Sequence, residues 1–193
     1  MVFKGAKWLR IFYHNVPLGG VFKDQEEAKH SISQYKFSII EDVSRDPMFK
    51  YRGKYEFLIQ FSDVSGYNWW RQSIFPLFED DNESIGTTVT GYEDVSISWR
   101  NNYWGGLAHT VRNIGGCINS LLDGSIKSGL YFYTIGNNNC NTNYPNTTPS
   151  NEDPGASEVT LWMRVFQFGY NSCRVCKRGN SISLFVICFV IQS

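Results

Sequence analysis

Tyr55 to Gln72, with the sequence YEFLIQFSDVSGYNWWRQ, is the stretch that decides the fold of this chain. Its first half alternates large apolar side chains with Glu56, Leu58, Gln60 and Ser62, which is the period of a β-strand. The apolar set is Tyr55, Phe57, Ile59 and Phe61. We therefore expect a core strand over 55–61 with one strongly buried face.

The second half of this stretch carries aromatic and hydrogen-bonding side chains in a dense group, and a second group of similar character follows further along the chain. Flat rings beside amides and guanidinium groups suit the recognition of sugars, and they suit protein hot spots equally well. Packing of alternate members in the core is the competing interpretation for any single tryptophan. The candidate ligand-binding residues are Tyr67, Asn68, Trp69, Trp70, Arg71, Trp99, Arg100, Tyr103 and Trp104.

Other stretches predict further strands and one helix. Asp24 followed by Glu27 predicts an N-cap and a helix as far as about His30, which we expect to be the only well-formed helix. The paired glycines in 104–107 predict a tight turn or a close backbone approach, and Asp123-Gly-Ser predicts a turn. Strands are predicted over residues 8–13, 35–41, 95–99, 130–135 and 158–166.

Irregularly spaced strands with one early helix favour a mainly β fold, specifically an antiparallel two-sheet β-sandwich of jelly-roll type. The chain has 193 residues, 16% of them aromatic and 17 of them glycine, which supports strands and turns around a substantial core. We predict a β-sandwich domain over 1–166 and a C-terminal extension over 167–193.

The formal charge of the chain is balanced, but its distribution is uneven. Eighteen basic and 18 acidic residues cancel, so the charge gives no argument for a nucleic-acid partner or an anionic membrane. Residues 1–54 carry ten Lys and Arg against six Asp and Glu, whereas residues 55–110 carry two against eight. The first residues lack the apolar core of a secretory signal and the cysteines number five, so we expect free thiols in the cytoplasm.

Residue types that support catalysis or metal binding are sparse. His14, His30 and His109 lie in no recognisable nucleophile or metal motif, and we interpret each as structural. The acidic run over 79–83 lacks the ligand spacing of a calcium loop and is interpreted as solvated. Cys173-Arg-Val-Cys176 is half of a zinc site or a redox pair, but no second Cys-x-x-Cys completes four ligands. We predict no enzyme activity, no cofactor and no metal.

The tail and a long loop are the predicted partner-contact elements. The loop over 137–155 is rich in Asn, Thr and Pro and has no alternation. The tail stretch LFVICFVI is too short for a bilayer, which needs roughly 20 apolar residues, and we expect a buried strand. A partner-binding strand and a membrane-associated end are the alternatives. The candidate contact residues are Asn139, Tyr144, Leu184, Phe185, Val186 and Ile187.

Eight short motifs occur in order along the chain: WLRIFYHN (8–15), EEAK (26–29), YEFL (55–58), GYNWWRQ (66–72), VTGY (89–92), WGGL (104–107), LDGS (122–125) and LWMRV (161–165). Together they resemble a large group of single-domain proteins from flagellated protists for which no activity is known. The likeness covers roughly residues 7–165 and ends where the extension begins. The resemblance implies a place in a flagellated cell but no reaction.

These observations lead to two functional hypotheses from different classes. The first is a non-enzymatic structural or interaction module with protein partners in a large intracellular assembly, such as the cytoskeletal or flagellar microtubule scaffold. The second is a lectin-like module that binds a glycan or a small polar ligand through the clustered Trp, Tyr, Arg and Asn side chains. A pocket for a small polyanion at Arg71, Arg100 and Arg112 is a weaker third.

Overall fold

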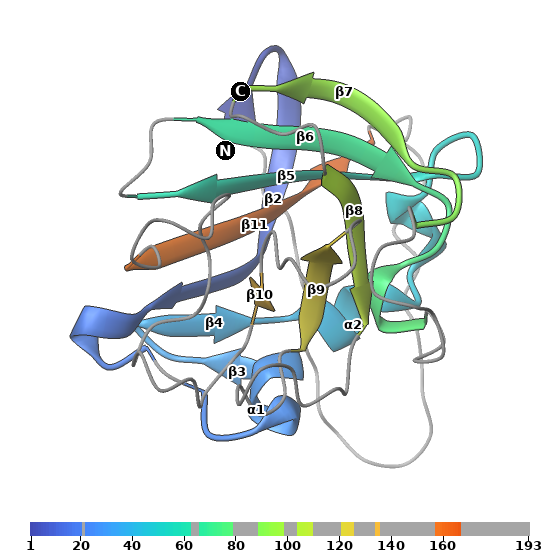
Figure 1. Cartoon of the computed structure of the whole chain (residues 1–193). Helices are drawn as coiled ribbons and strands as arrows, with labels where there is room; N and C mark the ends of the chain where they lie inside the picture. The colour runs from blue at the N-terminus through green and yellow to red at the C-terminus, as the bar shows by residue number, and fades with distance from the viewer. Residues whose placement is uncertain are drawn as a thin grey trace, which may run out of the picture.

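The computed structural model describes residues 1–20, 22–62, 66–78, 89–98, 104–109, 121–125, 134–135 and 157–166. Within these residues the chain is mainly β, with antiparallel sheets and few helices (Figure 1). The strands are β1 (Val2–Phe3), β2 (Ala6–Asn15), β3 (Ser31–Ile32), β4 (Lys36–Ser38), β5 (Tyr55–Phe61), β6 (Tyr67–Gln72), β7 (Glu93–Ile97), β8 (Trp104–His109), β9 (Leu122–Ser125), β10 (Thr134–Ile135) and β11 (Glu158–Val165). The helices are α1 (Gln25–Lys29) and α2 (Ile40–Ser44), with 3-10 turns at Val16–Leu18, Pro47–Phe49 and Pro76–Phe78.

Eight of the described strands form one large antiparallel sheet in the order β3-β4-β2-β11-β5-β6-β7, with β1 paired to β2. Strand β11 lies between β2 and β5, so that Leu161 is opposite Phe12 on one side and Ile59 on the other. A hydrogen bond of 3.0 Å from Asn15 Nδ2 to Glu158 Oε2 closes the same junction. The predicted strands over 55–61 and 158–166 are confirmed, the first with unchanged bounds.

The main hydrophobic core lies on one face of the large sheet, which we call the inner face. Alternate side chains of β5, β6 and β11 point into this core. Burial of a side chain of this size contributes about 1.5–3 kcal/mol to the free energy of unfolding. Among the core members are Ile11, Phe12, Phe22, Phe57, Ile59, Phe61, Trp70, Phe75, Val159, Leu161 and Met163.

Strand β5 is buried on both faces, which corrects the prediction of one buried face. Glu56 and Leu58 are as inaccessible as Phe57 between them. Leu58 belongs to a second, smaller cluster with Ala6 and Trp8 on the other side of the sheet. The reason is that aromatic side chains cover the face of β5 that was expected to be exposed. They come from the neighbouring strands and from the β1–β2 hairpin.

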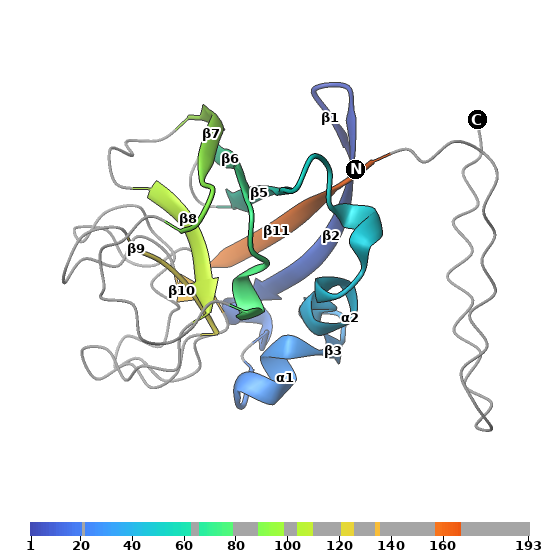
Figure 2. The same ribbon diagram turned by 90° about the vertical axis from the view of Figure 1, so that its right-hand side faces the viewer.

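A second sheet of three described strands has the order β10-β9-β8. Figure 2 shows it on the opposite side of the large sheet from the β1–β2 hairpin. Leu107, Leu121, Leu122 and Ile135 from this part of the chain belong to the same core cluster as the inner face of the large sheet. The main core is therefore shared by both sheets.

The described residues contain two α-helices, whereas the sequence predicted one. The side chain of Asp24 accepts a hydrogen bond from the backbone N–H of Glu27, which confirms the N-cap of α1. Of the predicted strand over 35–41 only Lys36–Ser38 is a strand, and α2 begins at its end. Ile40 and Val43 are both buried, and this spacing of three is helical, which a search for alternation misses.

Two predicted turns lie inside strands, since residues 104–107 begin β8 and Asp123-Gly-Ser lies in β9. The alternative expectation for the paired glycines, a close backbone approach, is confirmed. A Cβ added to Gly106, which has φ +95°, would lie 2.8 Å from Gln72 Oε1 and 3.3 Å from Trp70 Nε1. Only a glycine fits this position in β8 without displacing those groups.

The remaining predicted elements have mixed outcomes. Strands β2 and β7 confirm the predictions over 8–13 and 95–99 with shifted ends. Within the prediction over 130–135 the structure describes two residues, which form β10. The extension over 167–193 and the loop over 137–155 lie outside the described residues.

Candidate functional site

Strand β6 divides the first predicted ligand-binding group between the two faces of the large sheet. Asn68 and Trp70 are buried on the inner face, whereas Tyr67, Trp69 and Arg71 alternate with them and are only partly buried. The division follows from the two-residue period of a strand, which sends neighbouring side chains to opposite faces. Three of the five residues in the predicted group are therefore accessible to a ligand.

Trp70 is a core residue, which settles its two competing interpretations in favour of packing. Its indole is fully buried and stacks on Phe57 with ring centroids 5.6 Å apart. Its Nε1 donates to Gln72 Oε1 at 2.8 Å. The same side chain of Gln72 accepts from Leu107 N at 3.1 Å and donates to Leu107 O at 2.9 Å, as a neighbouring backbone would. Trp70 and Gln72 thus fix β8 to the large sheet.

We call the opposite face of the large sheet the outer face, because its side chains point away from the main core. The pairing register of the strands brings side chains from β2, β11, β5 and β6 together on it. Leu58 is opposite Trp69 on one side and Trp162 on the other, and Glu56 is opposite Arg71. The members of the outer face are Trp8, Glu56, Leu58, Gln60, Tyr67, Trp69, Arg71, Trp162 and Arg164.

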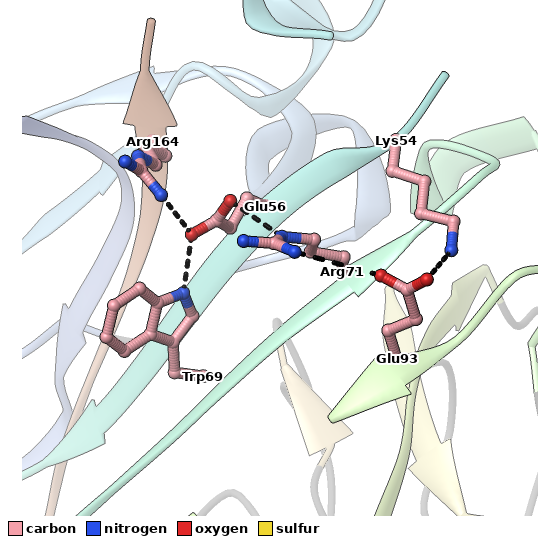
Figure 3. Close-up of polar contacts among 6 residues, drawn as sticks. All are labelled: Lys54, Glu56, Trp69, Arg71, Glu93 and Arg164. Carbon is pink, nitrogen blue, oxygen red and sulfur yellow. Dashed lines mark hydrogen bonds and ion pairs between the residues drawn. The ribbon is translucent and has the colours of Figure 1, made fainter. Parts of the chain in front are cut away.

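A buried carboxylate lies at the centre of the outer face (Figure 3). Glu56 has a side chain that is 1% exposed, and its oxygens accept three hydrogen bonds. Oε1 accepts from Trp69 Nε1 at 2.7 Å and from Arg164 NH1 at 2.7 Å, and Oε2 accepts from Arg71 Nε at 2.9 Å. Charge-assisted bonds of this kind offset the cost of removing a carboxylate from water.

The charged row continues from Arg71 to the edge strand. Arg71 NH1 lies 3.9 Å from Glu93 Oε2, and Lys54 forms an ion pair with the same carboxylate. The hydrogen bond from Lys54 is the main cause that lowers the pKa of Glu93 below its usual value. Since the row holds three cations and two carboxylates, it presents an excess of positive charge, with the Arg71 and Arg164 side chains 40% and 30% exposed.

The aromatic part of the outer face consists of indoles whose N–H groups all have internal acceptors. Trp162 Nε1 donates to Gln60 Oε1 at 2.9 Å, and Trp8 Nε1 donates to Phe3 O at 3.3 Å. Trp8 and Trp69 meet edge to face, with centroids 5.5 Å apart and planes at 83°. Trp8 is buried, so Trp69 and Trp162 are the indoles that can offer a flat face, and not a polar atom, to a ligand.

The predicted ligand-binding residues did not include six members of the outer face, namely Trp8, Glu56, Leu58, Gln60, Trp162 and Arg164. A signal for two of them was present, because alternation in 158–166 places Trp162 and Arg164 on the face opposite the core. That Trp162 and Arg164 lie beside β5 and β6 follows from the order of the strands in the sheet. No local sequence pattern gives that order.

The second predicted group is not joined to the first within the described residues. Trp99, Arg100 and Tyr103 lie outside the described residues, and Trp104 is described only as the first residue of β8. The predicted contact residues Asn139, Tyr144, Leu184, Phe185, Val186 and Ile187, and all five cysteines, also lie outside the described residues. The hypotheses that involve them stay predictions.

The described histidines occupy three different environments. His14 is fully buried, and burial lowers its pKa to about 3, so its ring is neutral. His30 Nδ1 lies 2.7 Å from Asp42 Oδ2 between α1 and α2, and His109 ends β8. In the described part of the chain no three or more His, Cys, Asp or Glu side chains are grouped so that they could hold a metal ion.

No helix among the described residues is long and apolar enough to cross a membrane. Comparison with protein families, with curated proteins and with solved structures finds no match to this chain. The resemblance to the protist group stays a prediction.

Proposed function

We propose that this protein is a non-enzymatic binding module that holds a protein partner on the outer face, within a larger intracellular assembly. One observation carries the proposal. The partly exposed aromatic rings of Tyr67, Trp69 and Trp162 lie beside two partly exposed guanidinium groups. These groups, of Arg71 and Arg164, are both bound to the buried carboxylate of Glu56.

The composition and rigidity of the outer face both support protein recognition. Trp, Tyr and Arg are the residues that contribute most to binding at protein interfaces. The hydrogen bonds to Glu56 hold Trp69, Arg71 and Arg164 in one arrangement before any partner arrives. Side chains that are ordered in advance lose less conformational entropy on binding, so more of the contact energy appears as affinity.

The identity of the assembly rests on the resemblance and not on the outer face. A cytoskeletal or flagellar scaffold is the assembly that the resemblance favours, with the tail and the loop over 137–155 as additional contact elements. We also propose that the two sheets form a β-sandwich of jelly-roll type. The shared core, in which Leu107, Leu122 and Ile135 join residues of the large sheet, supports that arrangement.

Cross-linking of the protein in extracts of its source cells, followed by mass spectrometry, tests the proposal. Lys4 and Lys54 border the outer face, whereas Lys29 lies on α1. We expect partner cross-links from the first two lysines and few from Lys29. The variant Arg164→Gln should weaken them, because it removes one guanidinium from the outer face and leaves the inner face untouched.

The matched control for this experiment is Ile32→Ala, which removes an apolar side chain that is 70% exposed on β3, away from the outer face. It should keep the cross-links of the wild type. Cross-links that come mainly from Lys29, or that persist unchanged in Arg164→Gln, would contradict a protein partner on the outer face.

The second candidate function is a lectin-like module, and the partly exposed ring of Trp162 beside Gln60 favours it. A pyranose could stack on the indole while the amide and Arg71 bind its hydroxyl groups. A glycan array separates the two functions: specific binding that is lost in Trp162→Ala and retained in Ile32→Ala supports the lectin. Because Trp70 is a core residue, its substitution tests folding and not binding.

A further inference from the structure

Three aromatic rings at one end of the outer face surround the ammonium group of Lys4. The Nζ atom lies over the rings of Tyr67, Phe3 and Trp69, at 4.8, 5.7 and 5.7 Å from their centroids. Each distance is within the roughly 6 Å at which a cation is attracted to the face of an aromatic ring. One cation therefore interacts with three rings at once.

The rings are arranged around a shared space and not stacked on one another. Phe3 meets Tyr67 at 77° with centroids 5.1 Å apart, and it meets Trp69 at 64° with centroids 6.3 Å apart. Rings in edge-to-face contact turn their faces in different directions. All three centroids nevertheless lie within 5.7 Å of the same ammonium group. This arrangement is that of an aromatic cage, the kind of site that recognises alkylated ammonium groups.

Two distant parts of the chain build the cage. Tyr67 and Trp69 are alternate residues of β6, so both project from the outer face. Phe3 comes from the β1–β2 hairpin, whose turn has positive φ at Lys4 (46°) and Gly5 (75°), as a two-residue type I′ turn requires. The turn places the Lys4 ammonium at the hydroxyl of Tyr67, 63 residues away in sequence.

The polar neighbours of the cage strengthen its attraction for a cation. Trp69 Nε1 donates to the carboxylate of Glu56 at 2.7 Å, which polarises the indole and makes its face more negative. The hydroxyl of Tyr67 accepts from Lys4 Nζ and lies 3.1 Å from Ser96 Oγ, so the phenol ring is fixed in place. Lys4 itself is exposed, so the cage is open to solvent on the side where Lys4 enters.

We propose that Phe3, Tyr67 and Trp69 form a cage for a methylated lysine side chain of the partner protein, and that Lys4 is its internal occupant. The inference rests on the proposed function, because the ligand belongs to that partner. The lysine assignment follows from the occupant, since a lysine ammonium already lies among the three rings. Methylation removes N–H donors and weakens hydration, so a methylated ammonium leaves water for the ring faces more readily than Lys4 does.

An internal occupant lowers the affinity for an external one. The apparent dissociation constant equals the intrinsic one divided by the fraction of molecules in which the cage is free of Lys4. Removal of the Lys4 ammonium should therefore tighten binding of an external methylammonium group by about tenfold if Lys4 occupies the cage roughly nine-tenths of the time. In the complete protein Lys4 then acts as a built-in competitor.

Titration of N-acetyl-Nε-trimethyllysine methylamide, followed by the NMR signal of the Trp69 indole N–H, tests the cage without any partner. The variant Lys4→Asn empties the cage and keeps the turn, because Asn-Gly is a preferred type I′ pair. We expect Lys4→Asn to bind with a Kd on the order of 1 mM and the wild type to bind about tenfold more weakly. Unmethylated blocked lysine and choline should both bind Lys4→Asn less tightly than the trimethyllysine probe.

Two further variants, made in the Lys4→Asn background, separate the cage from the rest of the molecule. Phe3→Leu keeps an apolar side chain but removes one ring face, and it should abolish most of the response. Tyr51→Leu is the matched control, because Tyr51 is also an exposed ring beneath a cation, with Arg52 at 5.2 Å, outside the cage. It should leave the titration unchanged.

Three results would overturn the inference: no response in folded Lys4→Asn, an equal response to methylated and unmethylated lysine, or a response that survives Phe3→Leu. Tighter binding of choline than of trimethyllysine would overturn the lysine assignment. These outcomes are independent of the cross-linking experiment. Cross-links from Lys4 and Lys54 without cage binding would leave the protein-binding face in place, whereas cage binding without cross-links would contradict the partner.

Discussion

Glu56 accepts hydrogen bonds from three side chains of the outer face. Its substitution therefore tests how much the stability of the protein depends on this one charge. Glu56→Gln keeps the size of the side chain but leaves Arg71 and Arg164 without their shared counter-charge. Both guanidinium groups are partly exposed and can rehydrate, so we expect a moderate loss of about 1–3 kcal/mol in the free energy of unfolding. Urea denaturation measures it.

Glu93→Gln is the matched control, because it changes the exposed carboxylate at the other end of the same charged row. Its urea midpoint should stay near that of the wild type. If the two variants have equal midpoints, burial of Glu56 does not matter for stability.

His14 makes the folded state sensitive to acid. Its ring lies in the core beside Phe12 and Phe22, with centroids 5.4 and 5.7 Å away, and neither ring nitrogen has a hydrogen-bond partner among the described residues. Burial lowers its pKa to about 3, against roughly 6.5 in an unfolded chain. Between these values the unfolded state binds a proton that the folded state does not, so stability is complete above roughly pH 6.5 and falls as the pH is lowered.

Denaturation at a series of pH values measures this contribution. The wild type should lose up to about 1.4 kcal/mol per pH unit on account of His14 as the pH falls from roughly 6 to 4. His14→Leu should remove that part of the slope, whereas Phe22→Leu, an adjacent change without a titrating group, should lower stability at every pH and keep the slope. Equal slopes for the wild type and His14→Leu would show that His14 does not titrate during unfolding.

Only part of this residue-level detail was predictable from the sequence. Alternation in β5 separates the two faces, but in β6 each face mixes aromatic and polar side chains: Asn68 and Trp70 point inward, and Tyr67 and Trp69 point outward. Hydrophobic periodicity therefore gives no contrast there. In the sequence, Glu56 looks like an ordinary polar residue on the exposed face of a strand. Its burial could not be predicted, because its hydrogen-bond partners lie up to 108 residues away.

Strand β8 is attached to the large sheet at Gly106, and a pair of glycine variants tests that junction. Gly106→Ala places a methyl group against Gln72 Oε1, Trp70 Nε1 and Val89 in addition to straining a backbone at φ +95°. Gly5→Ala meets nothing within 4 Å at φ +75°. We expect Gly5→Ala to cost about 1 kcal/mol and Gly106→Ala at least about 2 kcal/mol more.

Thermal unfolding of both variants measures the difference. Because both glycines have positive φ, the backbone contribution is similar and the excess belongs to the contacts around Gly106. Equal melting temperatures would mean that Trp70 and Gln72 move aside without cost, and that β8 is held elsewhere.

The strands and helices that could be predicted from the sequence are those with a clear hydrophobic period or a clear cap. Residues 55–61 alternate except at Leu58, residues 158–166 alternate, and α1 has an acidic N-cap signature, so these two strands and this helix were predicted correctly. Helix α2 was missed because its five residues are too few for a helical period to show. The turn predicted at Asp123-Gly-Ser was wrong, since in β9 the pairing with β8 and β10 overrides the local preference.

For the whole molecule, the central position of β11 predicts where the fold is most resistant to opening. Strands β2, β11 and β5 lie in the middle of the large sheet, are paired on both sides and carry core residues. Hydrogen exchange followed by mass spectrometry should be slowest in these three strands and faster in β3 and β7 at the edges. Faster exchange in β11 than in β7 would contradict this order.

Among the described residues, charges from the basic and acidic parts of the sequence pair with one another. Lys54, from the basic first part, pairs with Glu93 from the acidic middle, and Arg164 from the last described strand binds Glu56. The sequence predicted the mainly β class from composition and alternation. It did not predict which segments become neighbours, because strand order is set by packing over the whole chain and has no local signature.

The position of β11 also has a consequence for how the protein forms during synthesis. Strands β2 and β5 are made early, but each pairs with β11 and not with the other. Until residues 158–165 have left the ribosome, both strands therefore present unpaired edges beside apolar side chains, and the contact between Asn15 and Glu158 must close over 143 residues. We therefore expect the nascent chain to be prone to aggregation until residues 158–165 have been made.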